Sequence, residues 1–335
     1  MNLGEKIRHV AQMIENAESI VITTHEHPDG DAVGSSSALA YYLKSIGKHD
    51  INLIRDSIPD TIAFIDSYFK PVQPELVCQT IKRADLILCT DFADLERCGI
   101  YADAIRDSKA PKILFDHHAS PKEEEFDVIF SKIDISSSCE VVFNVLDQLC
   151  EDEDNKQKLF ESECGYCLMC GMTTDTNNFS CATYPSTFQM ASRLLGYGID
   201  RDDIISKLYN RYRENRVRAF AGILSDNFTI REDGLAVICV SEADWHKYGL
   251  KEGELEGLVN VPLSIDTVKV CIYFREDSST VRVSIRAKKG WSARKLAMTW
   301  FHGGGHELAS GGKLHIGEDL KHFSEINNYL KKIKL

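Results

Sequence analysis

The stretch SIVITTHEHPDGDAVGS, residues 19–35, joins an apolar run to a polar turn and then to the start of a helical pattern. Residues 19–25 predict a buried strand, because a strand covered on both faces needs a nearly continuous apolar run. Apolar residues at helical spacing, stopped by Gly47, predict a helix over residues 32–47, whose N-terminus favours bound anions. A strand followed at once by a helix is typical of a parallel βαβ unit.

This alternation continues through the first half of the chain. Further buried strands are predicted at residues 51–54, 85–91 and 112–118, and further helices at residues 138–150 and about 157–172. A long helix is expected from about residue 201 to 224, and strand-like runs follow it. With 335 residues the chain is too long for one ordinary core. We therefore expect an α/β protein with an N-terminal doubly wound, mostly parallel sheet and a smaller α/β domain behind it.

The overall composition describes a soluble globular protein. Hydrophobic residues make up 43% of the chain and charged residues 27%, with a net charge of −12. Such a surface repels long duplex nucleic acid, because binding to its backbone depends on neutralising phosphates. No uncharged run approaches the length of a membrane span, so we expect no membrane association and a cytoplasmic location. The eleven cysteines predict reduced thiols. Among them, Cys164, Cys167 and Cys170 could suggest a metal cluster, but their apolar helical pattern favours packing.

Carboxylates and histidines follow three of the four predicted strands. Parallel strands end at one edge of a sheet, where ligands gather, so these side chains are expected to share one crevice. A set rich in oxygen with one or two imidazoles suits Mn²⁺ or Mg²⁺ better than Zn²⁺. Paired divalent ions supply what hydrolysis of a phosphate ester needs. The candidate ligands are His25, Asp29, Asp31, Asp91, Asp116, His117, His118 and, after a predicted helix, Asp175.

Each candidate also has a purely structural interpretation. Asp29 could cap the following helix, Asp91 could be a turn residue at a strand end, and Asp175 could belong to a hydrogen-bonded turn. The two adjacent histidines of DHH are expected to point in opposite directions, so that at most one binds metal. Arg97 could contact a phosphate or form a surface ion pair with Asp94.

The segment HGGGH, residues 302–306, is a candidate phosphate cradle. Gly303, Gly304 and Gly305 would let backbone amides approach an anion, and His306 could add a donor. A flexible turn explains the same glycines equally well. Arg286, in the strand-like run VSIRA, could be a charged partner of the substrate or part of a surface salt bridge.

Taken in order, HEHPDGDAVGS, DFADLERCG, DHHAS and GMTTDTNNF resemble the four motifs of the DHH phosphoesterase superfamily. The downstream GGGH resembles the subset with a DHHA1 domain, and the similarity covers nearly the whole chain. This resemblance implies a DHH domain over residues 1–195, a helical linker over 196–222 and a DHHA1 domain over 223–335. It also implies an active site in the interdomain cleft.

The resemblance implies a role for each candidate residue. One metal ion would be held by His25, Asp29 and Asp91. The second would be held by Asp31, Asp91, His117 and Asp175, so that Asp91 bridges the two. Three further residues would act in catalysis: His118 facing the phosphate, Asp116 supporting it, and Arg97 stabilising negative charge. The substrate would be bound by Arg286, Gly303, Gly304, Gly305 and His306. His27 and His302 depart from the family pattern without removing a ligand, although His302 could narrow the cradle.

The resemblance is greatest to stand-alone nanoRNase and pAp phosphatase enzymes. It implies a metal-dependent phosphodiesterase that is both an exoribonuclease and a 3′(2′),5′-bisphosphate nucleotidase, in which a hydroxide between two Mn²⁺ ions attacks phosphorus. Its substrates would be short single-stranded RNA and 3′-phosphoadenosine 5′-phosphate (pAp). Two alternatives stay open, a phosphodiesterase for cyclic dinucleotides or pApA and a nucleotide sensor without catalysis. Homodimerisation is plausible for each of these functions.

Overall fold

A computed structural model describes residues 2–150 and 152–335. The chain forms two compact units, Met1–Arg211 and Tyr212–Leu335. In the described part of the chain, no helix has both the length and the apolar character needed to cross a membrane.

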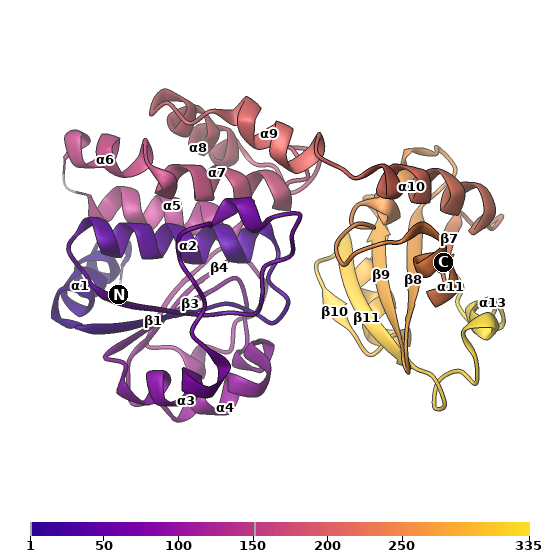
Figure 1. Cartoon of the computed structure of the whole chain (residues 1–335), viewed down its shortest axis with the longest axis horizontal. Helices are drawn as coiled ribbons and strands as arrows, with labels where there is room; N and C mark the ends of the chain where they lie inside the picture. Colours follow the sequence, from indigo (N-terminus) through magenta and orange to yellow (C-terminus); the bar gives the residue numbers. More distant parts are fainter. Residues whose placement is uncertain (1, 151) are drawn as a thin grey trace. The chain divides into compact units, whose positions relative to one another are not determined.

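The first unit is built on a sheet of five parallel strands in the order β2-β1-β3-β4-β5 (Figure 1). Every residue of β1, β3 and β4 is buried, which explains why their sequences are nearly unbroken apolar runs. The chain places β2 on one side of β1 and β3 on the other, so a topological switch point lies beside β1. The expected doubly wound parallel sheet is confirmed. Its strands are β1 Ser19–Thr23, β2 Asp50–Ile54, β3 Leu86–Thr90, β4 Lys112–Asp116 and β5 Val128–Ser131.

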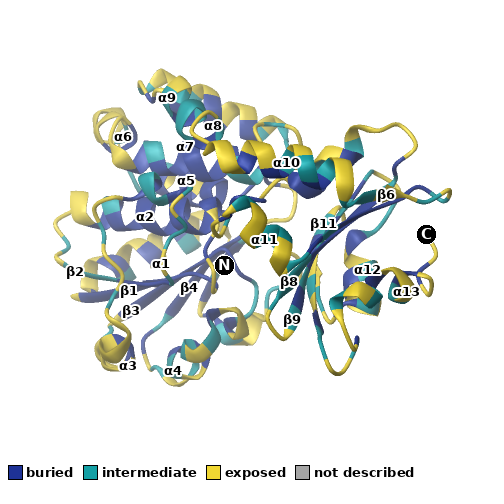
Figure 2. Ribbon diagram, turned by 45° about the vertical axis from the view of Figure 1, so that its right-hand side comes forward, coloured by how far each residue is buried: buried dark blue, intermediate teal, exposed yellow. Residues whose placement is uncertain are grey.

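Helices cover both faces of this sheet (Figure 1). The helices α1 (Leu3–Asn16), α2 (Gly30–Ser45) and α5 (Ser138–Leu149) pack on one face, and α7 (Glu163–Asp175) packs on α2 and α5. The helices α3 (Pro74–Arg83) and α4 (Ala102–Asp107) cover the other face. Figure 2 shows that the strands are buried while the outer helices expose one side. The remaining helices of this unit are α6 Glu153–Phe160, α8 Pro185–Gly196 and α9 Arg201–Tyr209, with 3₁₀ turns η1 Ala63–Ile65, η2 Leu95–Tyr101 and η3 Glu123–Glu125.

Small residues let α2 and α7 approach each other closely. A Cβ atom on Gly34 would lie 2.6 Å from the carbonyl oxygen of Cys167, and one on Gly171 would lie 3.0 Å from the carbonyl oxygen of Gly30 and 2.3 Å from the sulfur of Cys139 on α5. Neither position has room for a side chain in the present packing. This contact matters for function because α2 carries Asp31 and α7 ends at Asp175.

Two expected helices are each divided in two. The segment 157–172 contains the end of α6 and most of α7, and Ser162 caps α7 by accepting a hydrogen bond from the amide of Cys164. The segment 201–224 contains α9 and most of α10 (Glu214–Asp226). Residues 210–213 between them are all exposed, so no buried face supports a continuous helix there. All eleven cysteines are free thiols, and the three in α7 are buried.

The second unit contains a six-stranded sheet in the order β10-β11-β9-β8-β7-β6, antiparallel except for β7 with β8. Two hydrophobic clusters lie on its faces, one with α12 and α13 and the other with α10 and η4. The smaller mixed domain expected from the sequence is therefore present. Its elements are β6 Phe228–Ile230, β7 Leu235–Val240, α11 Glu242–Tyr248, η4 Leu258–Ser264, β8 Val270–Asp277, β9 Thr280–Ala287, α12 Ala293–Trp300, β10 Gly304–Gly305, β11 Ala309–His315, η5 Phe323–Glu325 and α13 Ile326–Leu330.

Candidate metal centre

The candidate ligands of the first unit stand at the carboxyl ends of neighbouring strands. His25 lies two residues after β1, Asp91 directly after β3 and His117 directly after β4. Asp31 lies in the first turn of α2, and Asp175 is the last residue of α7. Because the sheet order reverses beside β1, these segments converge on the crevice where doubly wound folds bind ligands.

His25, Asp29 and Asp91 form one group of possible ligands, with one donor atom of each within 4.8 Å of the others. The Nε2 atom of His25 lies 3.4 Å from Oδ2 of Asp91. Its Nδ1 atom is 2.7 Å from the carbonyl oxygen of Glu26, which can only accept, so Nδ1 carries the proton. This is how metal-binding histidines are commonly held, with the second nitrogen left to face the ion.

Asp31, His117 and Asp175 form a second such group. Nε2 of His117 lies 3.9 Å from Oδ2 of Asp31 and 3.6 Å from Oδ2 of Asp175. It also lies 3.6 Å from Oδ1 of Asp91, whose other oxygen faces His25. The two oxygens of Asp91 therefore face different groups, as a carboxylate shared by two cations would.

Asp91 has a left-handed backbone conformation, with φ at +68°. Its amide donates to the carbonyl oxygen of Phe115 at 3.0 Å, so the residue stays joined to β4 although β3 has ended. Aspartate and asparagine tolerate this conformation better than most residues do. The backbone as well as the carboxylate thus favours aspartate at this position.

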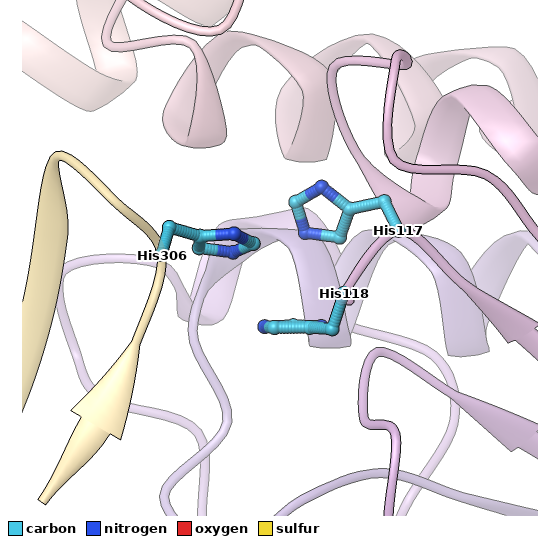
Figure 3. Close-up of side chains that lie close together, drawn as sticks. All are labelled: His117, His118 and His306. Atoms are coloured by element: carbon cyan, nitrogen blue, oxygen red, sulfur yellow. The ribbon is translucent and has the colours of Figure 1, made fainter. Parts of the chain in front are cut away.

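His117 and His118 lie side by side (Figure 3). Their ring centroids are 4.7 Å apart and the planes meet at 66°. The expectation that they point in opposite directions was wrong, because β4 ends at Asp116 and strand alternation no longer applies. Nδ1 of His118 lies 2.7 Å from Oδ1 of Asp116, and the Asp116 side chain is fully buried. Asp116 therefore orients His118.

The electrostatics of the centre suit bound cations. Burial and the nearby Asp91 raise the pKa of Asp31 to about 7, and burial raises the pKa of Asp175 well above its usual value. Burial opposes charge on His25 and His117 too. Their carboxylate partners, Asp91 first, outweigh that effect and raise the pKa of His25 to about 9 and of His117 to about 10. In the absence of metal, bound protons thus neutralise part of the negative charge of the carboxylates. Divalent ions would neutralise it more completely. The donor set fits such ions.

Two helix N-termini at the centre are occupied by carboxylates of the protein. Oδ1 of Asp29 accepts hydrogen bonds from the amides of Asp31 and Ala32, at 3.0 and 3.1 Å. The cap interpretation of Asp29 is therefore correct, and it is compatible with metal binding through the other oxygen. The expected anion site at the start of α2 is filled by this side chain. At the start of α5, the amides of Ser138 and Cys139 donate to the two oxygens of Asp31 at 2.6 and 2.9 Å.

Sequence reasoning missed Ser138, Cys139 and the carbonyl of Glu26. Two of these three contacts come from backbone atoms alone, which leave no signature in residue type. One signal was present: the pattern S-x-x-E, Ser137 to Glu140, marks a helix start. This helix start is more than forty residues from Asp91 in the sequence, so the pattern alone did not indicate that Ser138 contacts Asp91.

Arg97 lies in η2 with an exposed side chain, and within the described residues that side chain forms no hydrogen bond or ion pair. Asp94, its expected surface partner, is instead 2.7 Å from Nζ of Lys122. The carbonyl of Arg97 accepts from the amide of Glu26 at 2.8 Å, which ties its loop to the loop after β1.

In the second unit, the three glycines of HGGGH differ in whether their position could hold a side chain. A Cβ atom on Gly303 would lie 2.0 Å from the carbonyl oxygen of Gly311, and Gly305 has φ at +134°. Only Gly304 of the three faces open space and has an ordinary φ. Packing thus explains two of the glycines, and Gly304 is where a ligand could approach the backbone.

The other candidates of the second unit lie beside this loop. Arg286 on β9 pairs in register with Ala309 on β11, and Ala309 accepts from the amide of His306 at 2.8 Å. Figure 3 shows His306 on the loop after β10. The ring of His302 lies 3.1 Å from Asp319, which holds it in place.

The first unit is thus a doubly wound α/β domain with a candidate centre for two divalent cations at its switch point, followed by a mixed-sheet domain. Residues 19–172 match the DHH family N-terminal domain, and residues 233–332 match the DHHA1 domain. A solved structure of an exopolyphosphatase-related protein from Bacteroides fragilis is 31% identical, with a TM-score of 0.87 over 99% of this chain and 98% of that chain. The chain therefore belongs to the DHH family, with a DHHA1 domain, and it is a hydrolase.

Two curated relatives show the range of activities named among similar proteins. The bifunctional oligoribonuclease and PAP phosphatase NrnA of Bacillus subtilis is 26% identical over 90% of this chain and 91% of its own length. The cyclic-di-AMP phosphodiesterase GdpP of Geobacillus thermodenitrificans is 24% identical over 88% of this chain but only 44% of its own length.

Proposed function

We propose that this protein is a Mn²⁺-dependent phosphoesterase that hydrolyses short oligoribonucleotides and pAp. The observation that carries the proposal is the convergence of two ligand groups on the two oxygens of Asp91. His25 and Asp29 would hold one ion with Asp91, and Asp31, His117 and Asp175 would hold the other. When bound, such ions neutralise the phosphate and make a nucleophilic oxygen available at neutral pH.

The remaining residues of the site would bind the substrate and handle protons. Asp116 engages Nδ1 of His118 and helps to raise its pKa, against the effect of burial. A proton given to the leaving oxygen would therefore come from Nε2 of His118. The exposed guanidinium of Arg97 would contact phosphate oxygens as negative charge develops on them.

The second unit would hold the end of the substrate remote from the reaction. Gly304 would offer its backbone, and His306 and Arg286 would offer polar side chains beside it. Long duplex nucleic acid is not expected as a partner, because the net charge is −12.

The choice of pAp and short RNA is supported by the oligoribonuclease and PAP phosphatase, which matches this chain over nearly its full length. A cyclic-dinucleotide phosphodiesterase is the second candidate, favoured by the similarity to GdpP. A hydrolysis panel with Mn²⁺ separates the two, comparing pAp, pApA, short RNA, cyclic di-AMP and pyrophosphate. Fastest turnover of cyclic di-AMP would overturn our choice of substrate, and no metal-dependent turnover of any member would favour a sensor.

Asp91→Asn is the decisive substitution for the centre. It keeps the size and the left-handed backbone preference of the residue but removes the charge that two ions would share. We expect hydrolysis of pAp to fall by more than about 10²-fold, beyond what loss of a supporting contact causes. Asp103→Asn is the matched control, since that side chain is 90% exposed. A loss smaller than this for Asp91→Asn would count against a shared carboxylate.

A further inference from the structure

The N-terminal turn of α5 is used entirely by groups within the protein. The first amides of a helix have no partner inside it and must find one elsewhere. Here the amides of Ser138 and Cys139 bond the two oxygens of Asp31, and Oγ of Ser137 accepts from the amide of Glu140 at 3.1 Å. The positive end of this helix is therefore directed at a candidate metal ligand and not at a substrate phosphate.

Ser138 makes a second contact with the centre. Its hydroxyl donates to Oδ1 of Asp91 at 3.0 Å, while its amide donates to Oδ2 of Asp31 at 2.6 Å. The residue is completely buried, so water does not compete for these bonds. Ser138 thus connects Asp31, which lies after β1, to Asp91, which lies after β3.

Glu140 fixes the turn that presents Ser138. Its Oε2 atom accepts from the amide of Ser136 at 3.0 Å and also from the Ser136 hydroxyl. The same oxygen accepts from the hydroxyl of Thr187 on α8 at 2.9 Å. Ser136 and Glu140 are both completely buried. These bonds anchor the turn to a neighbouring helix and so restrain the position of Ser138.

We propose that Ser138 is a positioning residue of the metal centre, which sets the separation of Asp31 and Asp91 and with it the spacing of two bound ions. The inference rests on the proposed function, because it assumes that these carboxylates bind metal. Two buried carboxylates repel each other, and donors fixed in advance hold them in a geometry that an incoming ion need not create.

The test is a titration of the whole protein with Mn²⁺ alone, following the electron paramagnetic resonance signal of the unbound ion. Ser138→Ala removes the hydroxyl bond to Asp91 but keeps the amide bond to Asp31. We expect it to weaken Mn²⁺ binding by about 10- to 100-fold, the usual effect of losing a group that orients a ligand. Ser138→Gly removes the same hydroxyl without adding a metal ligand and carries the same test if the alanine variant does not fold.

Ser137→Ala is the matched control, since Ser137 is adjacent, equally buried and caps α5 without touching a ligand. It should lower the unfolding midpoint and change Mn²⁺ affinity by less than about threefold, because the contacts of Ser138 persist. Equal effects of the two substitutions on Mn²⁺ affinity would overturn the proposal, as would wild-type affinity in both Ser138 variants. If the wild-type protein binds no Mn²⁺, the proposed function fails with it. Two ions in the wild type with unaffected Ser138 variants would refute only the role of Ser138.

Discussion

Gly34→Ala tests whether the close contact of α2 with α7 sets the geometry of the metal centre. The added Cβ would lie 2.6 Å from the carbonyl oxygen of Cys167, whereas ordinary contact begins at 3.4 Å. The two helices must therefore separate by about 0.8 Å, or the carbonyl must tilt by a comparable amount. Overpacking costs about 1–3 kcal/mol, and alanine regains about 1 kcal/mol of helix propensity. The net loss in the free energy of unfolding should be about 0–2 kcal/mol.

The rate of pAp hydrolysis should be more sensitive to this substitution than the free energy of unfolding. Asp31 on α2 and Asp175 on α7 both face Nε2 of His117, at 3.9 and 3.6 Å. Catalytic groups must be held to within about 0.5 Å, and a displacement of about 1 Å can cost 10²-fold in rate. Urea denaturation of the metal-free protein and hydrolysis of pAp with Mn²⁺ measure the two effects separately.

Gly196→Ala is the control, because Gly196 ends α8 with nothing within 4 Å of an added Cβ and without a positive φ. It should leave activity unchanged and, through helix propensity alone, raise the free energy of unfolding by up to about 1 kcal/mol. Wild-type stability together with wild-type activity in Gly34→Ala would contradict this prediction, because it would show that α2 and α7 accommodate a methyl group without moving the ligands.

Three further predictions concern other parts of the site. His25 and His117, with pKa values raised to about 9 and 10, are protonated at pH 7 in the metal-free protein, and an ion binds only the neutral ring. Mn²⁺ binding should therefore release protons and tighten as the pH rises toward about 10; calorimetric heats that do not depend on the buffer would contradict this. Gly304→Ala should leave the free energy of unfolding unchanged and raise KM for pAp by about tenfold, which corresponds to the loss of one hydrogen bond to the substrate. Gly303→Ala should instead lower the free energy of unfolding by about 1–3 kcal/mol, because its Cβ would collide with a carbonyl oxygen of β11. Arg97→Ala should lower kcat by about 10²-fold without affecting urea denaturation, since its side chain is exposed; unchanged kcat would remove it from the reaction.

Much of the first unit could be predicted because its three central strands, β1, β3 and β4, are buried on both faces. The sequences of β1 to β4 contain apolar runs, three of which are followed by carboxylates or histidines, and each strand was located to within two residues. The short edge strand β5 was missed, because its side chains alternate between buried and partly exposed and its sequence lacks the long apolar run. The acidic run EDEDNKQK, residues 151–158, predicts a solvated loop, yet α6 begins at Glu153, capped by Asp152. Glu151 lies outside the described residues.

The side chains of the centre were predictable, but the way they are held was not. Motifs indicated which carboxylates and histidines matter, and the parallel sheet explained why they converge. The bond from the Glu26 carbonyl to His25 and the amide bonds to Asp31 depend on backbone paths that residue types do not reveal. The tilt of His118 toward His117 likewise depends on where β4 ends.

The candidate ligands lie between residues 25 and 175, on segments that only the folded chain brings together. Cations bound there would act as crosslinks between distant parts of the polypeptide. A ligand that binds only the native state stabilises it by about 2.7 kcal/mol at a hundred times its Kd. Removal of such a cation would therefore lower the stability of the fold as well as the activity, because the ion-free chain would open more often.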